Sequence, residues 1–292
     1  MRAEWSQYMR QQEWYRGIFR LLAIARRRFL LGRKGEKNMK KVLKLMLALV
    51  MTCAIAGCSS SSKNDADVTI TIGTSPDYAP YESLNKKGDI VGFDVDMVKL
   101  FEGYLSDMEG KTYSLEFKQM DFDNIVTQIQ GDQIDLGISG FTYSEDRVVE
   151  WSDPYLGSQQ VAVVPNGSSI TSNDQLVGKK LAAQTGATGE QAAKEVKDAD
   201  VVSMKNVQDI FNGLASNQYD AAIVDLGVAK QYVSSGNFTQ LDGSLMDEKN
   251  YIIAKKGNTK MIKLMNKCIE KFLASKDYDK LCKKYDLSPL EK

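Results

Sequence analysis

The sequence contains no histidine among its 292 residues. Histidine is the commonest general base and metal ligand, so its absence argues against serine and cysteine triads and against zinc-water hydrolysis. The protein also lacks an excess of either charge, because 38 basic and 38 acidic residues give a formal net charge of zero. Nothing in that balance attracts nucleic acid. We therefore expect a binding protein rather than an enzyme, with no catalytic residue, no metal site and no cofactor.

Cysteine is scarce, and its spacing fits no metal site. Cys53 and Cys58 lie in an apolar N-terminal run, whereas Cys268 and Cys282 lie near the C-terminus. Neither pair has the spacing of metal ligands. The C-terminal pair has two open possibilities, a disulfide outside the cytoplasm or two free buried thiols.

Two further patterns are missing, an internal repeat and the phosphate-binding pattern GxxxxGK[ST]. If the protein takes part in an energy-driven process, the energy must come from a partner. The length suits an anchor segment followed by two lobes of roughly 100 residues each.

The N-terminal region has the pattern of an export signal. From Met39, three lysines precede the apolar stretch 45–56, which is the charged and hydrophobic layout of a secretory signal. The stretch is short for a membrane span and ends in Ile55, Ala56, Gly57 and Cys58, followed by serines. This resembles a bacterial lipoprotein box, which implies a signal peptide over 39–57 and lipidation of Cys58.

The segments on either side of the signal have different characters. Residues 58–67 are small and polar, as in a flexible tether that holds a folded body off the membrane. Residues 1–38 carry many arginines before a second methionine and match no signal layout, so we interpret them as an upstream extension from a mis-assigned start. The expected location is extracytoplasmic, on a membrane lipid anchor.

The remaining chain predicts an α/β fold. Short β-branched runs alternate with amphipathic stretches, a pattern typical of strands that alternate with the helices that cover them. Strands are expected at 68–72, 113–118, 134–138, 160–164, 180–183, 221–224 and 251–254. Helices are expected at 94–105, 122–129 and 259–284, the last interrupted near Ser275.

Several ordered sequence blocks carry a more specific signal. They run from ITIGTSPDYAPYES and GDIVGFDVDMVKLF through DFDNIVTQIQGDQIDLGISGFTYSEDR and WSDPY to VGKKLAAQTGATGE, YDAAIVD and SKDYDKLCKKY. Over about 68–287 the chain resembles bacterial extracellular solute-binding protein family 3. The resemblance implies a periplasmic-binding-protein-like fold, a venus flytrap of two α/β lobes joined by two crossover strands. We place the crossovers near 158–161 and 247–251, which makes lobe one 68–158 plus 251–292 and lobe two 159–250.

The resemblance also implies a site for a free amino acid. Arg147 matches the family's carboxylate-binding arginine, a planar donor that stays charged when desolvated. Asp225 matches the partner of the ligand's ammonium group. The other implied ligand-binding residues are Tyr78, Phe122, Ser139, Gly140, Thr142, Gln184 and Thr188. Ser75 stands where binders of basic amino acids carry an acid, which weakens a lysine or arginine assignment, although Asp77 and Glu82 lie nearby.

Each of these residues has a plainer interpretation. Arg147 lies in a charged run and could be solvated. Thr142 and Thr188 each precede an acid or amide by three residues, so both fit a capping box. Asp225 could cap a helix, and Tyr78 or Phe122 could be core aromatics.

For function, the resemblance implies a monomer that captures a small amino acid and delivers it to the permease of an ABC-type importer. Two alternatives stay open. Some relatives with this fold dehydrate small acids, and others serve as sensory lipoproteins.

Overall fold

The first of two main sheets begins with a parallel core. The computed structural model describes residues 66–290. In it β1 (Val68–Thr74) pairs in parallel with β5 (Tyr113–Gln119) and with β6 (Leu136–Gly137). The antiparallel strands β14 (Ile253–Lys255) and β7 (Val149–Trp151) complete the order β5-β1-β6-β14-β7. β1 is rich in β-branched residues, and Ile70 and Ile72 are buried, as expected for a central strand.

The second sheet is built in the same way. β9 (Lys180–Gln184) pairs in parallel with β10 (Asp200–Met204) and β11 (Ala221–Asp225). The long strand β8 (Leu156–Pro165) runs antiparallel to β11 and β12 (Phe238–Gln240). β13 (Met246–Asn250) pairs with the first half of β8.

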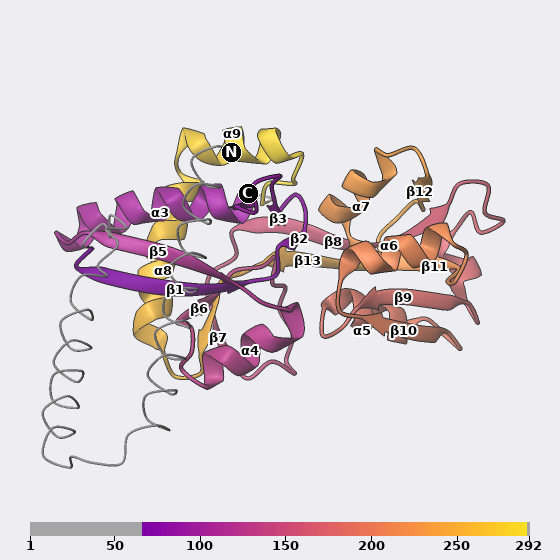
Figure 1. Ribbon diagram of the computed structural model, residues 1–292, viewed down its shortest axis with the longest axis horizontal. Coiled ribbons are helices and arrows are strands. Elements are labelled where there is room, and N and C mark those ends of the chain that lie inside the picture. Colours follow the sequence, from indigo (N-terminus) through magenta and orange to yellow (C-terminus); the bar gives the residue numbers. More distant parts are fainter. Residues whose placement is uncertain (1–65, 291–292) are drawn as a thin grey trace, which may run out of the picture. The chain divides into compact units, whose positions relative to one another are not determined.

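The chain passes twice between the two sheets. It leaves the first sheet after β7 and enters the second as β8, then returns through β13 to β14. β8 and β13 therefore run side by side as an antiparallel ribbon (Figure 1). This arrangement confirms the predicted two-lobed α/β fold with two crossover strands, while the predicted bounds of the lobes stay a prediction.

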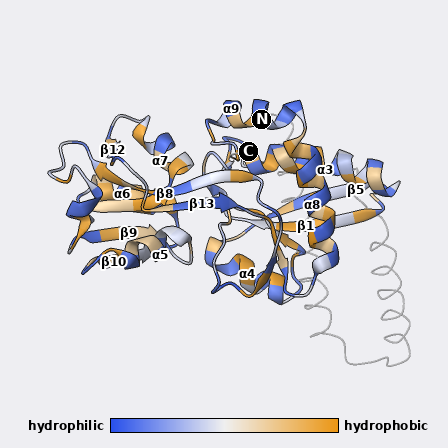
Figure 2. Cartoon of the chain, turned by 180° about the vertical axis from the view of Figure 1, so that it is seen from behind, coloured by the Kyte–Doolittle hydropathy of each residue, from blue (hydrophilic) through white to orange (hydrophobic). Residues whose placement is uncertain are grey.

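Helices cover both sheets. In lobe one they are α3 (Phe93–Glu109), α4 (Phe122–Gln130), α8 (Thr259–Leu273) and α9 (Lys276–Tyr285). In lobe two they are α5 (Thr188–Glu195), α6 (Val207–Ala215) and α7 (Leu226–Val233), with a 3-10 turn at Asn173–Leu176. Figure 2 shows hydrophobic and hydrophilic residues alternating along these helices. Their apolar sides pack on the sheets, and burial of this surface is the main force that holds each lobe together.

Aromatic contacts illustrate that packing in lobe one. Phe272 of α8 meets Phe93 and Phe101 of α3 edge-on, with ring centroids 6.2 and 6.0 Å apart. All three rings are fully buried. The predicted break near Ser275 is confirmed, since its hydroxyl caps α9 by accepting from the amides of Asp277 and Tyr278.

Two details differ from the sequence-based expectation, and one open alternative is resolved. The last predicted strand starts at Ile253 instead of residue 251, because Tyr251 donates its amide to the Phe141 carbonyl outside any ladder. A small sheet of β2 (Asp77–Tyr78), β3 (Glu82–Leu84) and β4 (Ile90–Val91), together with β10 and β12, was not predicted. Of the two possibilities for Cys268 and Cys282, the structure has both as free, buried thiols.

The described part of the chain has no helix that is long and apolar enough to span a bilayer. The extension 1–38, the signal 39–57, the lipidation site Cys58 and nearly all of the tether lie outside the described residues. Those assignments stay predictions.

Candidate functional site

The predicted site residues gather where parallel strands end. Tyr78 follows β1, Phe122 follows β5, and the segment Ser139 to Thr142 follows β6. In lobe two, Gln184 ends β9 and Asp225 ends β11. Ligands of open α/β sheets bind outside the carboxyl ends of the strands. The topology thus brings the two sets of residues to facing edges of the two lobes.

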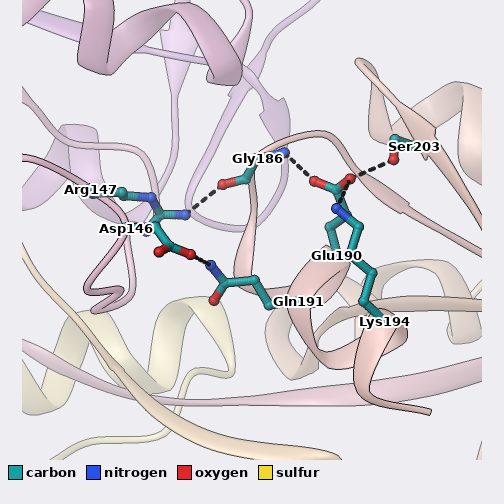
Figure 3. Close-up of polar contacts among 7 residues, drawn as sticks. All are labelled: Asp146, Arg147, Gly186, Glu190, Gln191, Lys194 and Ser203. Carbon is teal, nitrogen blue, oxygen red and sulfur yellow. Dashed lines mark hydrogen bonds and ion pairs between the residues drawn. The ribbon is translucent and has the colours of Figure 1, made fainter. Parts of the chain in front are cut away.

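Arg147 joins the lobes at one end of this region. Its guanidinium donates to the carbonyl oxygen of Thr142 in its own lobe at 2.5 Å and to that of Gly186 in lobe two at 2.7 Å. Figure 3 shows Arg147 pointing at Gly186, whose amide in turn donates to Glu190 at 2.7 Å. Gly186 has φ +77°, a left-handed conformation that glycine adopts without strain. Arg147 is therefore a half-buried cleft residue and not a solvated surface arginine.

Two aromatic rings flank the guanidinium of Arg147. Its guanidinium carbon lies 5.6 Å from the Phe122 ring centroid and 5.3 Å from that of Phe141, within cation–π range. Burial lowers the pKa of Arg147 to about 10, against the raising effect of Glu248 and Asp146. Arg147 remains charged at neutral pH, and among the described residues no carboxylate forms an ion pair with it. An anion between the lobes would find an unpaired guanidinium here.

The two threonines meet at the same end. The hydroxyls of Thr142 and Thr188 are 2.6 Å apart, and both residues are buried. The capping interpretation is wrong for both. Ala187 is the N-cap of α5 and Thr188 its first residue, while Thr142 forms an isolated bridge with Asn250 and begins no helix. The free amides and positive dipole end of α5 favour an anion at this place.

Asp225 lies at the end of β11 and is almost fully buried. It caps α7 by accepting from the Gly227 amide at 2.7 Å, so the helix-cap interpretation holds. Its carboxylate also accepts from the Tyr81 hydroxyl at 2.7 Å and from the Ser158 hydroxyl. Burial raises the pKa of Asp225, and these donors oppose the rise. Asp225 has no cationic partner among the described residues, which leaves its charge available to a ligand cation.

Tyr78 lies between Asp225 and Gly140. The Tyr78 hydroxyl accepts from the Asp225 amide at 3.3 Å, and the ring stacks on Tyr81 with centroids 5.8 Å apart. Gly140 has φ +56°, and a Cβ there would lie 3.5 Å from the Tyr78 ring. Phe122 stacks on Phe141 at 4.6 Å. Both predicted aromatics are buried, which agrees with the core interpretation, and their contact with a ligand stays a prediction.

Gln184 reaches across the lobes toward Asp77. Its amide donates to the Lys205 carbonyl at 3.1 Å and to Asp77 at 3.4 Å. Asp77 also accepts from the Val207 amide at 2.8 Å, where α6 begins, and burial raises its pKa. A cavity of about 460 Å³ adjoins this group. Its lining includes Ser75, Asp77, Gln119, Asp121 and Asn206.

Ser139 connects the site to a buried acidic pair that the sequence did not reveal as a unit. Its hydroxyl donates to Glu82 at 2.7 Å, and the neighbouring Gly140 amide donates to Asp94 at 3.1 Å. Glu82 and Asp94 are fully buried. Burial raises both pKa values, that of Asp94 to about 6 and that of Glu82 well above its usual range. Burial thus favours the protonated form of both carboxyls.

Glu248 on β13 was also missed. It accepts from the Gln160 amide at 2.9 Å and faces Thr142 and Thr188. Its neighbours Asp247, Lys249 and Asn250 are polar as well, so no hydropathy alternation in the sequence pointed to it.

Curated relatives cover most of the chain. It is 29% identical over 264 residues to a probable histidine-binding protein of Neisseria gonorrhoeae, with 85% of this chain and 96% of the relative covered. It is 31% identical over 258 residues to the arginine-binding extracellular protein ArtP of Bacillus subtilis, with 85% and 98% covered.

Solved structures agree in fold. The substrate-binding protein of an amino acid ABC transporter matches with a TM-score of 0.69 and 32% identity, covering 75% of this chain and 99% of that one. An ancestral arginine-binding protein bound to arginine matches with a TM-score of 0.68 and 33% identity, covering 74% and 97%. The family model of bacterial extracellular solute-binding proteins, family 3, matches residues 70–288. With the two-lobed fold and the matched relatives, this places the chain in that family: it is a bacterial extracellular solute-binding protein of family 3.

Proposed function

We propose that this protein binds a free amino acid between its two lobes and delivers it to the permease of an ABC-type importer. One observation carries the proposal: Arg147 bonds to Gly186 of lobe two, Asp225 bonds to Tyr81 of lobe one, and neither of these opposite charges has an ion-pair partner among the described residues. A zwitterion supplies both missing charges in one molecule. Its carboxylate and ammonium need such partners once closure removes water.

The geometry supports a proposed role for each residue. Arg147 binds the carboxylate together with Thr142 and the amino end of α5 at Thr188. Asp225 binds the ammonium group. The rings of Tyr78 and Phe122 contact the side chain, with Ser139, Gly140 and Gln184 completing the walls.

The cavity beside Asp77 limits the class of side chain. Asp77 accepts hydrogen bonds and has no cationic partner among the described residues, and Gln119 and Asn206 also line the cavity. We infer that the ligand's side chain carries N–H donors. The names of the relatives, which include histidine-, arginine- and glutamine-binding proteins, support this class.

Contacts between the lobes support a binding step coupled to closure. Gln191 of α5 donates to Ser144 of lobe one at 2.9 Å, and Lys205 of lobe two pairs with Asp121 and Asp123 at 3.3 Å. A ligand that contacts both lobes adds to these bonds and raises the closed population. The closed form is then the one that docks on the permease.

The N-terminal sequence supports the location. Maturation at Cys58 with a lipid anchor would keep the protein at the outer face of the membrane as a monomer near its importer. Intact-mass analysis of the native protein tests this point, since it expects a chain that begins at an acylated Cys58.

A thermal-shift screen against the twenty amino acids tests the proposed function. Arginine, lysine, histidine or glutamine should raise the melting temperature, and leucine and glutamate should not. Unchanged ligand after long incubation is expected, in keeping with a binder and not a dehydratase. No shift with any amino acid would overturn the proposal.

A further inference from the structure

Glu248 lies on the inward face of the crossover ribbon. Along β13 the exposed residues Asp247 and Lys249 alternate with the half-buried Glu248 and the fully buried Asn250. Successive side chains of a strand point to opposite faces, so Glu248 and Asn250 share the side that faces the cleft. Across the ladder, Glu248 pairs with Ser158, which is itself bonded to Asp225.

Its carboxyl group occupies the anion end of the site. Gln160 donates to Glu248 Oε2 at 2.9 Å and lies 3.4 Å from the Thr188 hydroxyl. The hydroxyls of Thr188 and Thr142 also face this carboxyl and lower its pKa, although burial, the largest effect, raises it. The groups expected to receive a ligand carboxylate therefore already surround a carboxyl of the protein.

The second oxygen of Glu248 has no partner. Oε1 is buried and makes no hydrogen bond within the described residues. A buried acceptor without a donor costs free energy of folding. If this oxygen is protonated, it becomes a hydrogen-bond donor that needs an acceptor. A ligand carboxylate held by Arg147 supplies that acceptor.

We propose that Glu248 shares the anion end of the site with the ligand's carboxylate and takes up one proton from solvent when the amino acid binds. The inference rests on the proposed function. Two ionised carboxylates beside a single guanidinium repel each other, so protonation of Glu248 accompanies binding and its O–H donates to the ligand. The affinity then falls as pH rises, because the proton becomes harder to obtain.

Other titratable and charged groups face Glu248, and none of them would take up a proton when the ligand binds. They are Arg147, with the exposed Asp146 beside it, Asp225 at the end of β11, and the Tyr78 phenol. Arg147 and Tyr78 do not titrate near neutral pH. A ligand ammonium lowers the pKa of Asp225, so a proton there would be released on binding. Uptake thus distinguishes Glu248 from Asp225.

Calorimetric titration in buffers of different ionisation enthalpy counts the protons. The probes are L-arginine and L-glutamine, whose side chains do not titrate between pH 6 and 8. The wild-type protein should take up about one proton per ligand, with an affinity that falls by as much as about tenfold per pH unit. Glu248→Gln should abolish the proton uptake and flatten the dependence of affinity on pH, because an amide does not titrate. The amide oxygen can still accept the bond from Gln160. The matched control, Asp247→Asn on the outward face, should leave both unchanged.

The outcomes separate the two claims. Binding without proton uptake, or uptake that persists in Glu248→Gln, overturns the role of Glu248 and leaves the proposed function standing. A wild-type protein that gives no heat with either probe and no thermal shift with any of the twenty amino acids overturns both. A folded Glu248→Gln variant, verified by its melting temperature, excludes loss of structure as the cause of any change.

Discussion

The side-chain hydroxyls of Thr142 in lobe one and Thr188 in lobe two are 2.6 Å apart and buried. This bond is the most direct polar link between the lobes at the point where the ligand's carboxylate is expected. A carboxylate that arrives there can accept from both hydroxyls and from the first amides of α5.

Loss of one hydroxyl should weaken binding moderately. Thr188→Val keeps the shape and the helix start but removes one donor to the ligand, which costs about 1 kcal/mol, roughly fivefold in affinity. Calorimetry with the best ligand measures it. An unchanged affinity would mean that the threonine serves only the contact with Thr142.

Removal of the guanidinium should weaken binding strongly. Arg147→Ala deletes the charged, bidentate donor to the ligand's carboxylate and should cost on the order of 3 kcal/mol or more of binding free energy. Arg147→Lys keeps the charge but not the planar fork, so it should recover part of the loss. Lys194→Ala is the control, because its exposed pair with Glu190 contributes about 0–1 kcal/mol.

Asp225→Asn should weaken binding while the fold persists. The asparagine oxygen can still accept from Tyr81 and from the Gly227 amide, and asparagine is a good helix cap. The ligand ammonium loses its charge partner, which should cost about 2–5 kcal/mol. Paired calorimetry and melting curves separate the two effects; equal affinities in the variant and the wild type would contradict the assigned role.

Because of the buried pair Glu82 and Asp94, the free energy of unfolding should decrease as pH rises. Both folded pKa values are raised, so their contribution is fully present below the unfolded values near 4 and is lost as pH rises, through about 6 for Asp94. Glu82→Gln removes the shared proton. The difference in unfolding free energy, wild type minus variant, should fall between pH 4 and pH 6 by up to about 1.4 kcal/mol per unit.

Urea unfolding at several pH values measures that difference. The control is the same substitution at an exposed acid on β5, Glu116→Gln. A flat difference for Glu82→Gln would show that the pair holds no shared proton.

The two C-terminal cysteines should be unreactive while folded. Burial raises the pKa of Cys268 to about 12 and that of Cys282 to about 11, so little thiolate exists at neutral pH. Alkylation mapped by mass spectrometry should label both only after denaturation, without a reductant. Failure to label them in denaturant would indicate a disulfide.

Ordered sequence blocks predicted the fold because it depends on local patterns, and the site that they imply stays a prediction. β-branched residues marked β1 and β11, and β11 ends in the polar residue Asp225. The helix caps were harder to assign. Thr188 and Gln191 have capping-box spacing, but the cap lies one residue earlier at Ala187.

Long-range pairings account for what the sequence did not reveal. Glu248 becomes a site residue only because β13 returns beside β8 and turns that side chain inward. Glu82 and Asp94 lie in different elements and become a proton-sharing pair only when Ser139 and Gly140 close over them. No spacing rule along the chain encodes either contact.

The central claim is that one zwitterion bridges Arg147 and Asp225. A crystal structure with the amino acid that gives the largest thermal shift tests it most directly. We expect the ligand's carboxylate within hydrogen-bonding distance of Arg147 and the amino end of α5, and its ammonium group on Asp225. A ligand bound elsewhere, or one that touches neither residue, would contradict the account.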